Sequence, residues 1–167
     1  MKTLLRTAAA VAALTVAATP ALAANATQNA TATARIVKPL TLTSKQNLDL
    51  GTITLVGSGS STVGISRAAV FSCPGVNVSC SGTSQVAVYT VTGVNNQSVN
   101  VTAPNFDLIN QADTAQKLTL AVDAPATVAL GNSGSAGTDF AIGGSVTVNG
   151  ATPEGTYIGN FVVTVNY

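Results

Sequence analysis

The sequence of 167 residues contains no histidine and no tryptophan. Histidine is the side chain most often used for acid–base catalysis near neutral pH and is a common zinc ligand, so its absence argues against both roles. The chain also lacks a Gly-x-Ser-x-Gly motif and any motif of paired acids, and its six carboxylates are dispersed. We therefore expect no enzyme activity, no cofactor and no metal site.

Charged residues are scarce as well, at 8% of the chain. Residues 24–167 carry five basic and six acidic side chains, which gives a net charge of −1. No basic stripe is present to hold phosphates, so the composition argues against nucleic-acid binding. Neutral polar side chains must cover most of the surface. Such a surface resists self-association weakly, which suits a protein that contacts copies of itself, but it is equally common in secreted β-proteins.

Residues 1–23 have the three parts of a secretory signal peptide. Lys2 and Arg6 form a basic start, residues 8–18 are an uncharged apolar run, and residues 20–23 end in a small-x-small cleavage pattern. The apolar run is shorter than the roughly 20 residues that a membrane-spanning helix needs. We therefore expect export and no transmembrane segment. The 144 residues that follow are enough for one domain with its own core.

Beyond the signal peptide, short runs rich in Val, Ile, Thr and Tyr alternate with clusters of Gly, Asn, Ser and Pro. This pattern predicts an all-β, antiparallel sandwich of seven or eight strands, which we expect to span residues 37–167. The predicted strands cover residues 33–42, 48–55, 64–71, 85–91, 98–103, 117–122, 140–148 and 156–167. Residues 105–116 are the one place where we expect a helical turn.

Two pairs of neighbouring strands are predicted to form hairpins. Residues 85–91 and 98–103 are joined by a short loop around Asn95 and Asn96, a residue type that tolerates left-handed backbone angles. Residues 140–148 and 156–167 are joined by a loop that begins at Asn149. Pro39 cannot donate to a β-ladder, so it places the first strand at an edge or makes it a strand start.

Cys73 and Cys80 are the only cysteines of the chain. In an exported protein so close a pair favours a disulfide, and Pro74 with Gly75 supplies the turn that brings the thiols together. Closing this short loop would stabilise the fold by roughly 2.5 kcal/mol on the chain-entropy account. A redox or metal site would need a two-residue spacing or further ligands. We therefore predict a structural disulfide.

Both ends of the exported chain alternate with a period of two, as β-strands do. At the C-terminus, the side chains that share one face are Tyr157, Phe161, Val163, Val165 and Tyr167. In the extension formed by residues 24–36, those that share one parity are Ala26, Ala30, Ala32, Ala34 and Ile36. The extension is therefore either a strand that adds to a sheet edge or a disordered leader before the domain.

Two stretches of the sequence resemble a known family. The first is ARIVKPLTL (residues 34–42) followed by NLDLGTI (residues 47–53). The second is FAIGGSVTV (residues 140–148) followed by GTYIGNFVVTVNY (residues 155–167). Together they resemble a family of bacterial secreted domains of unknown function numbered 4402. That family is similar in outline to spore-coat-U-like proteins and to subunits of chaperone–usher pili.

The resemblance implies an immunoglobulin-like sandwich that lacks one strand. The C-terminal face from Tyr157 to Tyr167 would border the acceptor groove left by the missing strand, and a periplasmic chaperone would fill this groove first, near Tyr167. The extension of the next subunit would then replace the chaperone as the donor strand. The chain departs from the pilin pattern because its extension offers mainly alanines, which contribute little buried area.

Two functions follow as expectations. One is a structural subunit of a pilus-like surface fibre, assembled with copies of itself or related subunits through a periplasmic chaperone and an outer-membrane usher. The other is a self-complete secreted sandwich that binds a surface ligand such as carbohydrate. Because no tryptophan is present to stack on sugars, the composition favours the fibre subunit.

Overall fold

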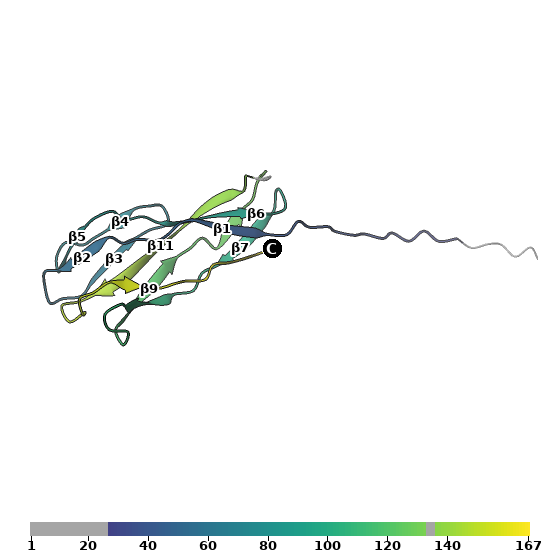
Figure 1. Cartoon of the computed structure of the whole chain (residues 1–167). Coiled ribbons are helices and arrows are strands. Elements are labelled where there is room, and N and C mark those ends of the chain that lie inside the picture. Colours follow the sequence, from purple (N-terminus) through teal and green to yellow (C-terminus); the bar gives the residue numbers. More distant parts are fainter. Residues whose placement is uncertain (1–26, 133–135) are drawn as a thin grey trace, which may run out of the picture. The chain divides into compact units, whose positions relative to one another are not determined.

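The computed structural model describes residues 27–132 and 136–167 (Figure 1). The predicted signal peptide and Ala26 lie outside the described residues. Every regular element in the described residues is a strand, and every strand pair is antiparallel. The prediction of an all-β, antiparallel fold is confirmed. Across the same residues, no helical segment has the length and apolar character needed to cross a bilayer.

The described chain forms thirteen strands. In chain order they are β1 (Thr41–Gln46), β2 (Thr52–Leu55), β3 (Ser61–Ile65), β4 (Phe71–Ser72), β5 (Val78–Ser81), β6 (Ala87–Thr92), β7 (Ser98–Thr102), β8 (Phe106–Asn110), β9 (Lys117–Asp123), β10 (Thr127–Ala129), β11 (Thr138–Val148), β12 (Tyr157–Ile158) and β13 (Thr164–Asn166). The predicted strand at residues 156–167 thus comprises two short strands.

Residues 27–40 form no strand. Residues 27–35 are not part of the body, which comprises Ile36–Tyr167. The predicted strand at residues 33–42 is therefore wrong over most of its length, because the ladder begins only at Thr41, two residues after Pro39. Proline has no N–H to donate, so pairing with β6 starts after it.

Strand β11 organises the body. Its first half pairs with β6, from Thr138 to Ile142, and its second half pairs with both β3 and β9. The sheet continues through β6 to β1 and through β9 and β8 to β12. Gly143 stands at the junction of the two halves, where a Cβ atom would come within 2.6 Å of the backbone nitrogen of Arg67. A side chain at this position would therefore force the strands apart.

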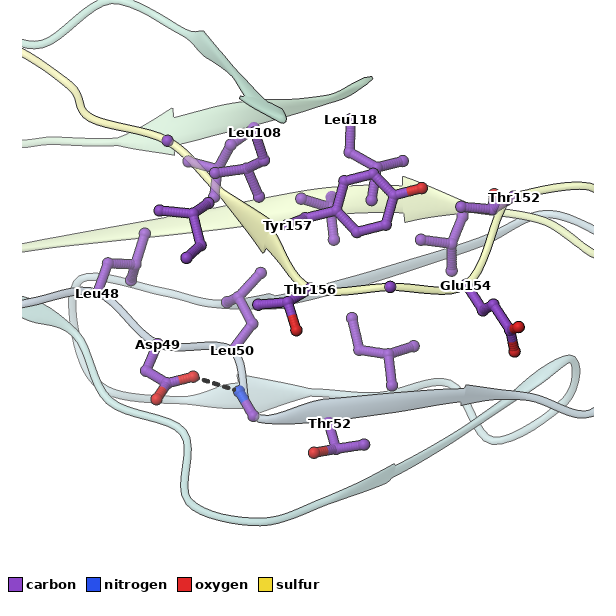
Figure 2. A pocket seen from close by; sticks show the side chains of 18 of the residues that line it. Leu48, Asp49, Leu50, Thr52, Leu108, Leu118, Thr152, Glu154, Thr156 and Tyr157 are labelled. Carbon is purple, nitrogen blue, oxygen red and sulfur yellow. Dashed lines mark hydrogen bonds between the residues drawn. The ribbon is translucent and has the colours of Figure 1, made fainter. Parts of the chain in front are cut away.

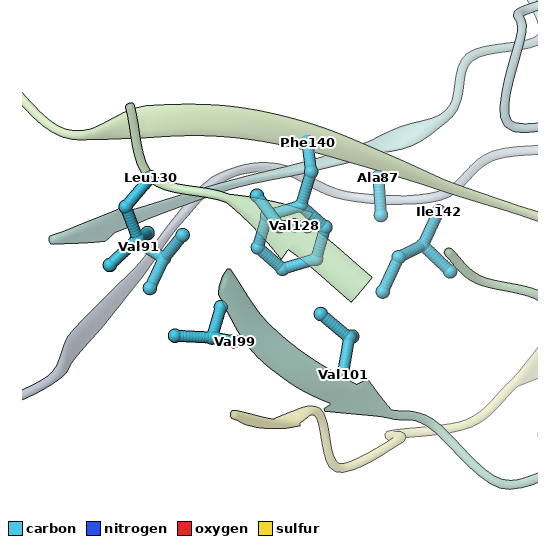
Figure 3. Packing of buried hydrophobic residues seen from close by; sticks show 8 residues of the cluster. All are labelled: Ala87, Val91, Val99, Val101, Val128, Leu130, Phe140 and Ile142. Atoms are coloured by element: carbon cyan, nitrogen blue, oxygen red, sulfur yellow. The ribbon is translucent and has the colours of Figure 1, made fainter. Parts of the chain in front are cut away.

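Side chains of β11 contribute to two hydrophobic cores. Near the first half of β11, the strands β10, β7 and β13 form a three-stranded sheet that covers the core (Figure 3). Val99 and Val101 of β7 point across this core toward Phe140 and Ile142 of β11. We call this cluster the closed core; it comprises Ala87, Val91, Val99, Val101, Val128, Leu130, Phe140 and Ile142.

The second core lies against the last residues of β11. Its covering layer is the two-stranded sheet of β2 and β5. We call this cluster the open core; it comprises Val63, Val78, Leu120, Val146 and Val148. Ten apolar or cysteine side chains around it are only partly buried against five that are buried, whereas at the closed core ten are partly buried against eight that are buried. The open core is therefore the less completely covered of the two.

Both predicted hairpins are wrong. Strand β6 pairs with β1 and β11, whereas β7 pairs with β10 and β13 in the facing sheet. Strand β11 likewise does not pair with β12 or β13, which bond to β8 and β7. Between β6 and β7 the chain crosses from one sheet to the facing one. After β11 it returns to the same sheet at its edge as β12, and only then crosses to the facing sheet as β13.

The predicted helical turn at residues 105–116 is also wrong. Phe106–Asn110 is strand β8, which pairs with β9 from Phe106↔Leu120 to Ile109↔Lys117. The turn that follows is built by Asn110, whose Oδ1 accepts hydrogen bonds from the backbone nitrogens of Ala112 (2.8 Å) and Asp113 (3.3 Å). Asparagine favours such turns because its side chain imitates a backbone acceptor.

Candidate functional site

A groove of about 930 Å³ opens over the open core (Figure 2). One wall is the continuous stretch of residues 48–55, which ends in β2. The opposite wall is the continuous stretch of residues 152–159, which includes β12. Figure 2 shows Leu48 and Leu50 on one side, with Leu108, Leu118 and Tyr157 facing them. The groove is thus an opening between the beginning and the end of the body.

The floor of the groove is aliphatic. Leu120, Val146 and Val148 form its buried base. The apolar side chains that line it while remaining partly exposed are Leu48, Leu50, Ile53, Leu55, Phe106, Leu108 and Leu118. These side chains pack against the open core and leave part of their apolar surface facing the groove.

The walls present backbone edges to the groove. Four consecutive residues of β2 line it, although their side chains alternate between the two faces of the strand, so the strand turns its edge to the groove. β2 pairs with β5 alone, and the backbone nitrogen of Val56 donates to Asn77 O (2.9 Å). Because alternate residues of an antiparallel ladder bond to the same side, Ile53 and Leu55 direct their backbone groups away from β5 and towards the groove.

The opposite wall repeats this arrangement. β12 pairs with β8 alone, and the backbone nitrogen of Gln111 donates to Thr156 O (2.8 Å). The backbone groups of the next residue, Tyr157, therefore point away from β8 and towards the groove. Across the described residues, no hydrogen bond joins the wall at 48–55 to the wall at 152–159. Two backbone edges flank the apolar floor.

Asn110 and Gly155 hold the second wall in place. Asn110 is buried, and its Nδ2 donates to Glu154 O (2.9 Å). Gly155 has a φ of 143°, and a Cβ atom there would lie 2.6 Å from the Asn110 side chain. Glycine meets both requirements, since it adopts positive φ without strain and leaves room for the amide. The Tyr157 hydroxyl closes the same loop by donating to Pro153 O (2.7 Å).

A second cavity of about 270 Å³ continues the groove towards the closed core. It shares Leu48, Ile158, Gly159 and Phe161 with the groove, and Tyr89 is among the residues that it adds. The Phe161 ring stacks on Phe106 at 5.0 Å between centroids and meets the edge of Tyr89 at 6.3 Å. Burial among these rings raises the pKa of Tyr89, against a smaller opposing effect from a hydrogen bond with Ser44.

Of the residues that the structure describes, two charged side chains line the groove, Asp49 and Glu154, and both are acidic. They lie on opposite walls, and the backbone nitrogen of Gly51 donates to Asp49 Oδ1 (2.8 Å). No set of three His, Cys, Asp or Glu side chains among the described residues is close enough to hold a metal ion. The groove is therefore apolar at its floor and mildly acidic at its rim.

The C-terminal residues that the sequence assigned to the acceptor groove fall in three places. Tyr157 and Phe161 line the groove. Val163 and Val165 are partly buried against the closed core. Tyr167 ends the chain beyond them, and its hydroxyl lies 2.8 Å from Lys38 O. The alternation of these side chains between partly buried and exposed agrees with the sequence pattern up to Val165.

The residues predicted to form a donor strand are exposed. Ala30, Ala32 and Ala34 have exposed side chains, and Ile36 is 93% exposed. In an isolated molecule the Ile36 side chain buries almost no surface here, so it contributes no hydrophobic stabilisation. The predicted disulfide is present, since Cys73 and Cys80 are bonded and both side chains pack against the open core.

The sequence did not identify the wall at residues 48–55 as part of a site. The sequence nevertheless contains a pattern typical of an edge strand in this stretch. Apolar residues alternate with other residues on both sides of Gly51, at Leu48, Leu50, Ile53 and Leu55. Leu108 was missed because its segment was expected to be helical. The motif NLDLGTI, on which the family resemblance partly rests, forms most of this wall.

The sequence was compared with protein families, curated proteins and solved structures. The family described as "Domain of unknown function (DUF4402)" matches residues 40–167. No curated protein and no solved structure matches the chain. The matched residues include every described strand and both walls of the groove. The chain therefore belongs to the DUF4402 family.

Proposed function

We propose that this chain is a structural subunit of a surface fibre, and that its groove receives a β-strand from the N-terminal extension of a neighbouring copy. The observation that carries the proposal is the groove itself. In the described residues, its apolar floor lies between two strand edges, β2 and β12, that have no strand partner on that side.

An extended peptide would satisfy both edges at once. Strand addition is a recognition mode in which backbone hydrogen bonds supply affinity and alternate side chains supply specificity. Each ladder hydrogen bond contributes about 0.5–1.5 kcal/mol net, and covering the floor adds about 25 cal/mol for each Å² of apolar surface removed from water. A compact ligand would cover the floor but leave the backbone groups of Ile53, Leu55 and Tyr157 without partners.

The N-terminal extension has the pattern that such a site needs. Ala30, Ala32, Ala34 and Ile36 share one parity, so in an extended strand all four would face the floor. Ile36 supplies the one large side chain of this set, and each alanine adds a small buried area. The residues of opposite parity, such as Thr31 and Thr33, would face solvent.

The charges of the N-terminal extension and of the groove are complementary, which also favours the extension as the strand that the groove receives. The only charged residues in the stretch 24–38 are Arg35 and Lys38, which are both basic. Within residues 27–132 and 136–167, the charged residues that line the groove are Asp49 and Glu154, which are both acidic. Opposite charges at the rim of a binding site favour encounter and register more than affinity.

In this proposal the groove is a joint and not a catalytic site, and the chain needs no cofactor. A periplasmic chaperone would cover the groove after export, and an outer-membrane usher would pass the subunit to the growing fibre at the cell surface. Because one copy gives its extension and receives another's in a different place, the contact runs head to tail and does not close into a dimer.

The proposal is tested with the chain that begins at Ala24 and two charge variants of β9. Leu118→Glu places a carboxylate on the groove floor, whereas Ala121→Glu adds the same charge on the exposed face of the same strand. We expect multimers from the unaltered chain and from Ala121→Glu in light-scattering chromatography. We expect monomers from Leu118→Glu and from a chain that begins at Lys38.

Equal assembly of Leu118→Glu and the unaltered chain would contradict the proposal. A chain from Ala24 that stays monomeric at every concentration, and whose folding is unaffected by the peptide of residues 24–37, would also contradict it. That second result would leave the self-complete sandwich that binds a surface ligand as the remaining function.

A further inference from the structure

The last residue of the chain ties the two layers of the body together at the closed core. The Tyr167 hydroxyl accepts a hydrogen bond from the backbone nitrogen of Val94 (2.9 Å) and donates one to Lys38 O (2.8 Å). Lys38 precedes β1 and Val94 follows β6, which are paired strands of one sheet. Tyr167 itself follows β13, an edge strand of the facing sheet. One hydroxyl group thus bridges the layers.

The loop under this tyrosine is shaped to receive it. Gly93 adjoins Val94, and a Cβ atom at Gly93 would lie 2.8 Å from the Tyr167 hydroxyl and 2.7 Å from Leu40 Cδ2. Any larger residue would therefore push the ring or Leu40 out of place. Leu40 and Val165 are in turn partly buried against the closed core, so packing supports the hydrogen bonds.

The opening between the layers ends where this tie begins to act. The groove walls run over residues 48–55 and 152–159, and the smaller cavity extends the opening only to Asn47 and Phe161. Beyond these residues, Leu42 and Val163 pack against the closed core. On this side of the sandwich, the two layers are therefore separated by the groove at the open core and packed together at the closed core.

We infer that Tyr167 is a clamp that sets the length of the strand-binding groove, so that the site takes a strand of about eight residues rather than one that runs the full length of the body. This inference rests on the proposed function. Without the clamp, the edges of β1 and β13 would separate, and the opening would extend towards Lys38. The clamp also fixes the point at which the extension leaves the body, because Lys38 is one of its two partners.

The bonds of the clamp are accessible to water, since the Tyr167 side chain is 44% exposed. Tyr167→Phe removes both hydrogen bonds and keeps the ring. Two net hydrogen bonds correspond to roughly a tenfold or larger change in the equilibrium between closed and open clamp. We therefore expect the backbone nitrogen of Val94 to exchange its hydrogen roughly tenfold faster in this variant.

The test is hydrogen–deuterium exchange of the chain from Ala24, kept dilute, with and without an excess of the synthetic peptide of residues 24–37. In the unaltered chain, the peptide should protect residues 47–55 and 152–161 only. In Tyr167→Phe, protection should extend to residues 41–46 and 163–166. Thr62→Val is the matched control, because it removes a hydroxyl that is hydrogen-bonded to Thr147 (2.9 Å), away from both the groove and the clamp, and should leave residues 41–46 unprotected by the peptide.

A chain that ends at Asn166 removes the clamp in a second way and should give the same footprint as Tyr167→Phe. Protection of residues 41–46 in the unaltered chain, or an identical footprint in Tyr167→Phe, would overturn the clamp while leaving the groove as the binding site. Absence of peptide protection anywhere would overturn the proposed function, and the clamp inference with it.

Discussion

The two ends of the body use the same strand and the same kind of side chain, yet only one end is closed. Phe140 and Ile142 of β11 are covered by a three-stranded sheet, whereas Val146 and Val148 of the same strand are covered by two strands with a groove beside them. The difference lies in how many strands cover each core and not in the apolar character of β11.

A β-sandwich can tolerate an unoccupied strand position at one end when its other end is well packed. The closed core supplies much of the packing that holds the body together, and it includes the two largest fully buried side chains, Leu130 and Ile142. The open core keeps a smaller buried base, while its surrounding leucines remain partly exposed. A body stabilised at one end can therefore leave the other end incomplete for a partner.

The largest expected difference between the two ends is the loss of stability when one isoleucine at each end is replaced by alanine. Ile142→Ala should lower the free energy of unfolding by about 2–5 kcal/mol, because Ile142 has no exposed surface and its truncation leaves a cavity. Ile53→Ala should cost about 1 kcal/mol, since Ile53 is already partly exposed in the groove wall. Chemical denaturation measures both, and equal losses would show that the two ends are equally packed.

The disulfide should matter less than Ile142. Replacing Cys73 and Cys80 together by serine should lower the free energy of unfolding by about 2.5 kcal/mol, since the unfolded chain loses a short closed loop. Both cysteines also pack against the open core, and Cys80 is opposite Ile53 in the ladder of β2 and β5. We therefore expect loss of the disulfide to speed hydrogen exchange in β2 and β5. Faster exchange in β7 and β10 instead would contradict the separation of the two ends.

The smallest expected effect is on the stability of the fold in acid, and it comes from the carboxyl of Asp139, which precedes Phe140 of the closed core. The hydrogen bonds from Lys45 and then from the Thr90 hydroxyl hold the pKa of Asp139 below its ordinary value of 3.8. A carboxyl whose pKa is lowered by folding stabilises the fold above its unfolded pKa, and this contribution is lost as the pH falls through the folded value. These groups join β1, β6 and β11 through the exposed side chains of Lys45 and Asp139 and the buried Thr90.

Asp139→Asn should therefore remove part of the loss of stability that accompanies acidification from neutral pH to about pH 3. The measurement is thermal unfolding of both proteins across this range. An acid profile that is the same with and without the carboxyl would show that this surface cluster contributes nothing to the closed end.

The sequence indicated which faces of its strands are buried better than it indicated their partners. The alternation from Tyr157 to Val165 corresponds to partly buried and exposed side chains in the structure. The pairing of Thr164 with Thr102 and of Tyr157 with Asn110 was not predicted. Periodicity depends on neighbours along the chain, whereas pairing depends on contacts between segments far apart in it.

The groove shows the same limit. Tyr157 and Phe161 were named from the sequence and do line it, but Val163, Val165 and Tyr167 share their pattern and lie at the closed end. The alternation of apolar side chains does not show at which residue the groove ends. That boundary is set by the contacts of the facing sheet and by the hydroxyl of Tyr167, which no local pattern reports.

The most direct test of the account is cross-linking between two variants that each carry one added cysteine beside the Cys73–Cys80 disulfide, mixed in equal amounts under mild oxidation. Thr33→Cys marks the extension on its solvent-facing parity, Thr54→Cys marks the groove wall, and Thr127→Cys is an exposed threonine of β10 at the closed end. We expect Thr33→Cys to form a covalent pair with Thr54→Cys at least about tenfold faster than with Thr127→Cys. Equal rates for the two partners would contradict the claim that the open end receives the extension of another copy.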